Sequence, residues 1–138
     1  MDKIDYSIII PAYNEAKIIS DTIDKCFDFF KKLNKSFEII IANDGSKDDT
    51  AAIVNLKLRK YKNLRLVSNH INMGRGAALN NAIKNSKGKI LVYIDADLAI
   101  DLELFPNLVG AIENNGIDIA VGSKHMKDSM VEYPRLRR

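Results

Sequence analysis

Short apolar runs of strand length alternate along the chain with longer stretches in which apolar residues recur at helical spacing. The first run holds Ile8, Ile9 and Ile10 in succession, and an unbroken run of this kind is typical of a parallel strand that is buried on both faces. Strands are predicted in this way over residues 7–11, 37–42, 64–68, 90–94 and 117–121. Helices are predicted between them, over residues 15–33, 46–61, 77–85 and 106–115.

Local signals support some of the helix ends. Ser46 and Asp49 have the spacing of a capping box, so we expect Ser46 to cap the second helix. Pro106 suits the first turn of the fourth helix, and Gly116 suits its end. The regular alternation of strands and helices predicts an α/β fold, with a mostly parallel open sheet and helices on both of its faces.

Each of the first four predicted strands is followed directly by a polar or glycine-rich segment. These segments cover residues 11–15, 43–46, 69–76 and 95–97. Because parallel strands bring their C-terminal ends to one edge of the sheet, we expect the four segments to meet there. In open α/β sheets that edge is where ligands bind.

Asp95 and Asp97 lie two residues apart, just past a predicted buried strand, and are expected to share one side of the chain. Two neighbouring carboxylates repel each other, and a cation between them removes the conflict. Mg²⁺ or Mn²⁺ fits such oxygen ligands, and these ions commonly keep positions open for phosphate oxygens. Two solvated acids in an ordinary loop are the alternative for the pair taken alone.

The other three segments carry weaker signals, each with a plain structural alternative. Asp44 can accept a hydrogen bond from a base N–H, or it can belong to a simple turn. Gly74 and Arg75 precede a helix and suit a phosphate, although glycines at this point also suit a tight turn. They do not make a dinucleotide fingerprint, because Leu79 stands at the third glycine position. Tyr13 has a ring that can flank a nucleobase.

The composition is that of a soluble globular protein, with 46% hydrophobic and 28% charged residues among 138. One domain is therefore expected over residues 1–138. A net charge of +3 is too small to indicate nucleic-acid binding. The apolar runs are too short to cross a bilayer, and Cys26, the only cysteine, excludes a disulfide and agrees with a reducing cytosol.

Taken in order, the four segments resemble those of glycosyltransferase family 2, which has the GT-A fold. The matching residues are 9–15, 43–50, 72–77 and 95–97 in the four segments, and residues 122–124 match as a fifth piece. The resemblance implies that Asp95 and Asp97 form the Asp-x-Asp pair that binds Mg²⁺ or Mn²⁺, with Asp97 the firmer ligand. The nucleotide-binding residues expected from the resemblance and from the residue types are Pro11, Tyr13, Glu15, Asp44, Gly74, Arg75 and Asp95.

The resemblance further implies an inverting transfer, in which the acceptor attacks once, in line, and expels the nucleoside diphosphate. Metal charge would stabilise that leaving group. The segment after the metal pair resembles the polyprenyl-phosphate branch, which includes dolichyl-phosphate glucosyl- and mannosyltransferases. In that branch basic residues receive the lipid phosphate, which implies this role for Lys124, Arg135 and Arg138.

Two departures from the branch bear on the donor and on the acceptor. Lys124 stands where an arginine is usual, which weakens bidentate phosphate recognition. Residues 127–129 replace the glycine pair of the mannosyl-transferring members, which favours a UDP-glucose-like over a GDP-mannose-like donor. Residues 122–138 would begin the acceptor side, and the rest of that half is missing, so the chain looks truncated.

The expected partners are a nucleoside-diphosphate sugar and a lipid-phosphate acceptor, with no nucleic acid. The expected location is the cytoplasm or the cytosolic face of a membrane, and peripheral membrane contact and a homodimer stay open. The basic residues near the end of the chain have a solvated tail as their alternative. Two other functions also stay open: transfer to a glycan or polysaccharide hydroxyl, and a non-catalytic sugar-nucleotide-binding module.

Overall fold

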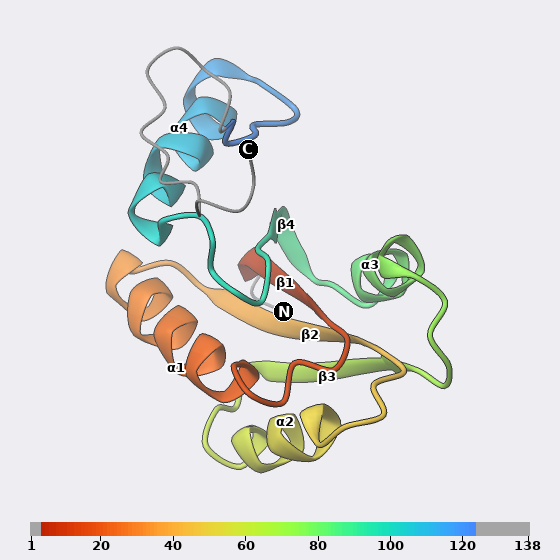
Figure 1. Cartoon of the computed structure of the whole chain (residues 1–138). Coiled ribbons are helices and arrows are strands. Elements are labelled where there is room, and N and C mark those ends of the chain that lie inside the picture. The colour runs from red at the N-terminus through yellow and green to blue at the C-terminus, as the bar shows by residue number, and fades with distance from the viewer. Residues whose placement is uncertain (1–3, 124–138) are drawn as a thin grey trace, which may run out of the picture. The chain divides into compact units, whose positions relative to one another are not determined.

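The computed structural model describes residues 4–123, and Figure 1 shows the course of the chain. The strands are β1 (Ile4–Ala12), β2 (Phe37–Asp44), β3 (Leu64–Asn69) and β4 (Gly88–Tyr93). The helices are α1 (Ile19–Phe30), α2 (Thr50–Leu58), α3 (Arg75–Lys84) and α4 (Phe105–Asn115), with short 3₁₀ turns η1 (Lys31–Leu33) and η2 (Leu102–Leu104).

The chain divides into two compact units, residues 1–99 and residues 100–138. The first unit contains all four strands with α1, α2 and α3, and the second contains η2 and α4. Pro106 lies in the first turn of α4 and Gly116 ends that helix in a left-handed conformation, as the sequence predicts. The expectation of a single nucleotide-sugar-binding domain over residues 1–138 stays a prediction.

The sheet of the first unit has the strand order β3-β2-β1-β4, and every neighbouring pair is parallel. In the pairing of β1 with β2, Ile8 lies opposite Ile39 and Ile10 lies opposite Ile41. All four of these side chains are fully buried. The parallel sheet predicted from the first four apolar runs is confirmed.

Helices cover both faces of this sheet, as predicted. α1 and α2 lie on one face, and α3 lies on the other (Figure 1). On the α3 face, Ala78 and Ala82 pack against Ile9 and Ile40, and their small side chains let the helix approach the strands closely. On the other face, α1 packs at the start of β2, where the rings of Phe27 and Phe37 have centroids 5.6 Å apart.

The strand predicted over residues 117–121 is wrong, because the structure has no strand in that stretch of the described chain. Ile119 and Val121 are 77% and 76% exposed. An apolar run becomes a strand only where a neighbouring strand takes up its backbone hydrogen bonds. No such pairing partner exists for this run among residues 4–123.

The prediction that Ser46 caps the second helix is also wrong. α2 begins at Thr50, and the N–H of Thr50 donates to Oδ1 of Asp48 (3.0 Å). Ser46 Oγ instead accepts the N–H of Asn14, 32 residues away in the sequence (3.0 Å). The spacing of a capping box cannot distinguish a helix cap from an acceptor that serves a distant loop.

Candidate nucleotide and metal site

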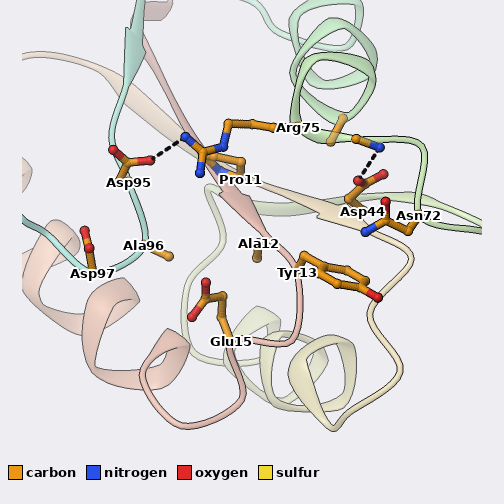
Figure 2. A pocket seen from close by; sticks show the side chains of 12 residues that line it. Pro11, Ala12, Tyr13, Glu15, Asp44, Asn72, Arg75, Asp95, Ala96 and Asp97 are labelled. Carbon is orange, nitrogen blue, oxygen red and sulfur yellow. Dashed lines mark hydrogen bonds and ion pairs between the residues drawn. The ribbon is translucent and has the colours of Figure 1, made fainter.

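A pocket of about 450 Å³ opens at the C-terminal edge of the sheet (Figure 2). The end of β2 and the segments that follow β1, β3 and β4 all contribute to its walls, as the parallel arrangement predicts. Every residue predicted to bind the nucleotide or the metal lines this one pocket. Its lining residues are Pro11, Ala12, Tyr13, Glu15, Asp44, Asn72, Gly74, Arg75, Ala78, Asp95, Ala96 and Asp97.

The loop after β1 is held in place by the loop after β2. The backbone N–H of Glu15 donates to Thr50 Oγ1 (2.8 Å), and that of Ala16 donates to Asp48 Oδ2 (3.1 Å). Together with the bond from Asn14 to Ser46, these contacts fix the direction in which the loop leaves the sheet. Polar side chains of residues 46–50 therefore position Tyr13 and Glu15 at the pocket, a role that their sequence spacing did not indicate.

Asn14 completes this connection between the two loops. Its backbone is in the left-handed region with φ of 55°, which asparagine tolerates better than most residues. In this conformation its side-chain Oδ1 accepts the N–H of Lys47 (2.8 Å) while its own N–H donates to Ser46 Oγ. The two loops thus exchange hydrogen bonds in both directions.

Asp44 is 4% exposed and anchors the loop after β3. Its Oδ1 accepts hydrogen bonds from Asn69 Nδ2 (2.9 Å) and from the N–H of Met73 (2.9 Å), and its Oδ2 accepts the N–H of Gly74 (2.8 Å). Burial opposes ionisation of this carboxyl, but the three donated bonds outweigh burial and lower its pKa. A carboxylate has about four acceptor positions, so about one remains for a ligand.

Asn81 of α3 extends the hydrogen bonds of Asp44. Its Nδ2 donates to Oδ1 of Asn69 (3.0 Å), and Asn69 in turn donates to Asp44. Because Gly74 directly precedes the helix, α3 is attached to the end of β2 at its start and, through Asn69 at the end of β3, near its middle. This double attachment determines where Arg75, the first residue of α3, enters the pocket.

Glu15 brings a third carboxylate into the pocket beside the Asp-x-Asp pair. Its pKa is raised, first by burial and then by the negative charges of Asp97 and Asp48. Figure 2 shows its side chain in the same pocket as Ala96 and Asp97. A charged Glu15 is therefore unfavourable for folding at neutral pH, which is expected of a group kept for ligand binding.

Glu15→Gln is expected to raise the melting temperature at pH 7 by about 2 °C, since it removes this unfavourable charge. A raised carboxyl pKa favours folding below its ordinary value of 4.5 and loses this contribution as the pH rises through the raised pKa. The advantage of the variant should therefore shrink on acidification and disappear near pH 4. Thermal unfolding at both pH values measures it.

Glu103→Gln is a matched control for this prediction, because Glu103 is an exposed glutamate on η2, outside the pocket lining. It should leave the melting temperature almost unchanged at either pH. A Glu15→Gln protein that melts at or below the wild-type temperature at pH 7 would contradict the charge argument.

Asp95 is already engaged by two side chains. Tyr93 donates its phenolic O–H to Asp95 Oδ1, and Arg75 Nη1 lies 3.6 Å from the same oxygen. Arg75 Nη1 also donates to the Tyr93 hydroxyl (3.3 Å). Tyr93 did not appear among the predicted site residues, although its separation of two from Asp95 in an extended segment was a signal that both point to one side.

Asp97 is the more exposed member of the pair, and its Oδ1 accepts the N–H of Ala99 (3.0 Å). A hydrogen bond from α1 fixes the turn between the two acids, because Thr22 Oγ1 donates to the carbonyl of Ala96 (2.6 Å). Nowhere in residues 4–123 do three or more Asp, Glu, His or Cys side chains gather as a metal site. Two carboxylates fit a hard divalent cation whose remaining ligands are water and phosphate oxygens.

The predicted acceptor-phosphate residues Lys124, Arg135 and Arg138 lie outside the described residues, and their role stays a prediction. No helix within the described range 4–123 is both long enough and apolar enough to cross a membrane.

The sequence profile of Glycosyl transferase family 2 matches residues 7–138. The chain belongs to this family. The match includes the whole pocket lining, from Pro11 to Asp97, so the predicted family is confirmed. The chain is similar to a dolichyl-phosphate beta-glucosyltransferase of Dictyostelium discoideum, with 36% identity over 140 residues, 94% of this chain and 43% of the relative.

Two solved structures are similar to this chain in fold. The mannosyltransferase PcManGT from Pyrobaculum calidifontis, in complex with GDP-Man and Mn²⁺, has a TM-score of 0.68 and 25% identity, over 82% of this chain and 33% of that one. The glucosyl-3-phosphoglycerate synthase from Mycobacterium tuberculosis, in complex with Mn²⁺, UDP and glucosyl-3-phosphoglycerate, has a TM-score of 0.60 and 28% identity, over 80% and 40%. These similarities confirm the GT-A-like fold.

The chain spans less than half the length of the curated relatives that it matches. The activity, substrates and partners of the whole protein are therefore proposals.

Proposed function

We propose that this domain binds the nucleoside diphosphate of a sugar donor in the pocket at the sheet edge, as part of an inverting, metal-dependent glycosyltransferase. The observation that carries the proposal is the convergence on one pocket of an aromatic ring, a buried acid, an arginine and two exposed acids. These residues are Tyr13, Asp44, Arg75, Asp95 and Asp97. The similar structures with GDP-Man and Mn²⁺, and with UDP and Mn²⁺, support it.

Each wall of the pocket suits a different part of such a donor. The Tyr13 ring is 41% exposed and can stack on the base, and the remaining acceptor position of Asp44 can take a base N–H. Arg75, at the start of α3, is 70% exposed and can pair with phosphate oxygens. Asp95 and Asp97 would hold the divalent cation, Mg²⁺ or Mn²⁺, which supplies positive charge to the leaving diphosphate.

The proposed acceptor is a polyprenyl or dolichyl phosphate, which the similarity to the dolichyl-phosphate beta-glucosyltransferase supports. A phosphate acceptor is already anionic at neutral pH, so its attack on the sugar requires no general base. Lys124, Arg135 and Arg138 are the residues proposed to receive that phosphate, at the face of the membrane where the lipid is presented. A UDP-glucose-like donor is proposed over a GDP-mannose-like one, since residues 127–129 lack the glycine pair.

Calorimetric titration of UDP and of GDP, each with and without Mn²⁺, tests the proposed donor site. Mn²⁺ is expected to tighten binding of the preferred nucleotide by about tenfold or more, and UDP should bind more tightly than GDP. Equal affinities with and without Mn²⁺ for both nucleotides would refute the metal-dependent site. Tighter binding of GDP would leave the site in place and reverse the donor class.

A further inference from the structure

Arg75 extends from the start of α3 toward Asp95, and both residues line the pocket (Figure 2). Its Nη1 lies 3.6 Å from Asp95 Oδ1 and 3.3 Å from the hydroxyl of Tyr93, which donates to the same carboxylate oxygen. The three side chains thus form a closed set of contacts between α3 and the end of β4. In this arrangement the guanidinium is the counter-ion of Asp95, at the position where the proposed function requires a metal.

A divalent cation and this guanidinium repel each other if both contact Asp95 at the same time. Both are positive, and a cation bound to Asp95 would come within a few ångströms of Arg75, where like charges repel appreciably even beside water. Arg75 must therefore leave Asp95 when the metal binds. Tyr93 carries no charge and can keep its hydrogen bond to Asp95 during that exchange.

The ion pair between Arg75 and Asp95 is weak enough to break when a ligand binds. The side chains are 70% and 43% exposed, and exposed ion pairs of this kind are weak. A diphosphate offers the guanidinium more negative charge and a bidentate partner, which is a stronger interaction than a single carboxylate oxygen at 3.6 Å. The diphosphate of the donor can therefore replace Asp95 as the partner of Arg75.

We propose that Arg75 forms an ion pair with Asp95 in the donor-free protein. When the donor diphosphate binds the guanidinium, this ion pair breaks and Asp95 becomes free to bind the metal. Tyr93 is a positioning residue in this exchange, because its hydroxyl contacts both partners. The donor and the metal then favour each other's binding through Arg75, in addition to any direct contact between phosphate and metal. This inference rests on the proposed donor site and specifies the order in which its parts assemble.

If Arg75 competes with the metal for Asp95, removing Arg75 should increase the affinity for the metal when no nucleotide is present. Mn²⁺ binding to the nucleotide-free protein, followed by electron paramagnetic resonance of the free ion, should be about two- to fivefold tighter in Arg75→Gln than in the wild type. Lys84→Gln is the matched control, because it removes one exposed positive charge from the other end of α3. It should leave the Mn²⁺ affinity unchanged.

The Asp95→Asn background separates the specific contact from a general effect of charge. There, Arg75→Gln should no longer tighten Mn²⁺ binding, because Asp95 is no longer an anion that Arg75 neutralises. An equal gain in both backgrounds, or no gain in the wild-type background, would overturn the exchange. If Mn²⁺ promotes nucleotide binding to the wild type in either of those cases, the proposed donor site survives and only this inference fails.

Nitrogen NMR of the arginine side chains gives a readout that needs no metal. The guanidinium signal of Arg75, assigned from its loss in Arg75→Gln, should shift when Asp95 is changed to Asn and should shift again when UDP is added to the wild type. A signal that is unmoved by Asp95→Asn would show that Arg75 does not hold Asp95 in solution, which also overturns the exchange.

Discussion

Asp97→Ala is expected to remove the metal-dependent part of nucleotide binding, a loss on the order of 100-fold in affinity at saturating Mn²⁺. Asp97 is the more exposed acid of the pair and belongs to a turn that is fixed by the bond from Thr22 to the carbonyl of Ala96. Losing Asp97 leaves Asp95 as the one remaining acid of the pair, and Asp95 is already paired with Arg75. Affinity for the nucleotide without metal should change much less.

Calorimetry of UDP and GDP with and without Mn²⁺, on both proteins, measures this loss. Asp28→Ala is the matched control, because Asp28 is an exposed acid of α1 whose salt bridge with Lys31 lies at the surface. That variant should keep the whole gain that Mn²⁺ gives. An Asp97→Ala protein that also keeps it would contradict the role assigned to Asp97.

Gly45→Ala is expected to lower the free energy of unfolding by about 3 kcal/mol, the combined cost of a strained backbone and of steric overlap. Gly45 follows Asp44 and has φ of +66°, a conformation that side chains rarely adopt. A Cβ at this position would lie 2.4 Å from the carbonyl carbon of Ile71 and 2.7 Å from the nitrogen of Asn72. Backbone atoms cannot rotate away, so the loop after β3 would have to move.

Gly76→Ala is the matched control, since a Cβ at Gly76 meets nothing within 4 Å and the residue lies inside α3. Alanine there should raise the free energy of unfolding by about 0.5–1 kcal/mol. Urea unfolding of both variants gives the comparison, with opposite signs expected. A Gly45→Ala protein within 0.5 kcal/mol of the wild type, an approximate threshold set by ordinary surface substitutions, would show that the loop yields easily.

The displaced loop links this stability effect to the site. Residues 71–74 carry the N–H groups that donate to Asp44, and they lead directly into Arg75. Gly45→Ala should therefore weaken nucleotide binding in the fraction of protein that remains folded. The pocket depends on close packing between the ends of β2 and β3 as well as on the chemistry of its lining.

Much of the pocket could be predicted because its residues follow strands that are easy to recognise. The runs at Ile8–Ile10 and at 37–42 are apolar enough to indicate burial on both faces, and burial on both faces implies a parallel sheet. Parallel strands then place Tyr13, Asp44 and Asp95 on one edge without any knowledge of strand order. That is why all the predicted nucleotide and metal residues line one pocket.

The partners of those residues could not be predicted in the same way. Ser46 has the local spacing of a helix cap, yet its oxygen serves Asn14, and the prediction failed because 32 residues of chain separate the two. Glu38 shows the same limit inside an apolar run. It is 2% exposed and accepts hydrogen bonds from Ser7 Oγ (2.7 Å) and from Arg65 Nη1 (3.0 Å), on the neighbouring strands.

The sequence by itself determined the four strands of the sheet and the helices between them, and therefore which residues reach the ligand-binding edge, since hydrophobic period and turn chemistry act over a few neighbouring residues. Tertiary structure alone decided the order β3-β2-β1-β4, and with it the contacts between loops. That order places Arg75 and Tyr93 together on Asp95 and engages Asp44 with the loop after β3. Such contacts depend on packing among segments far apart in the chain, and no local pattern of residues encodes them.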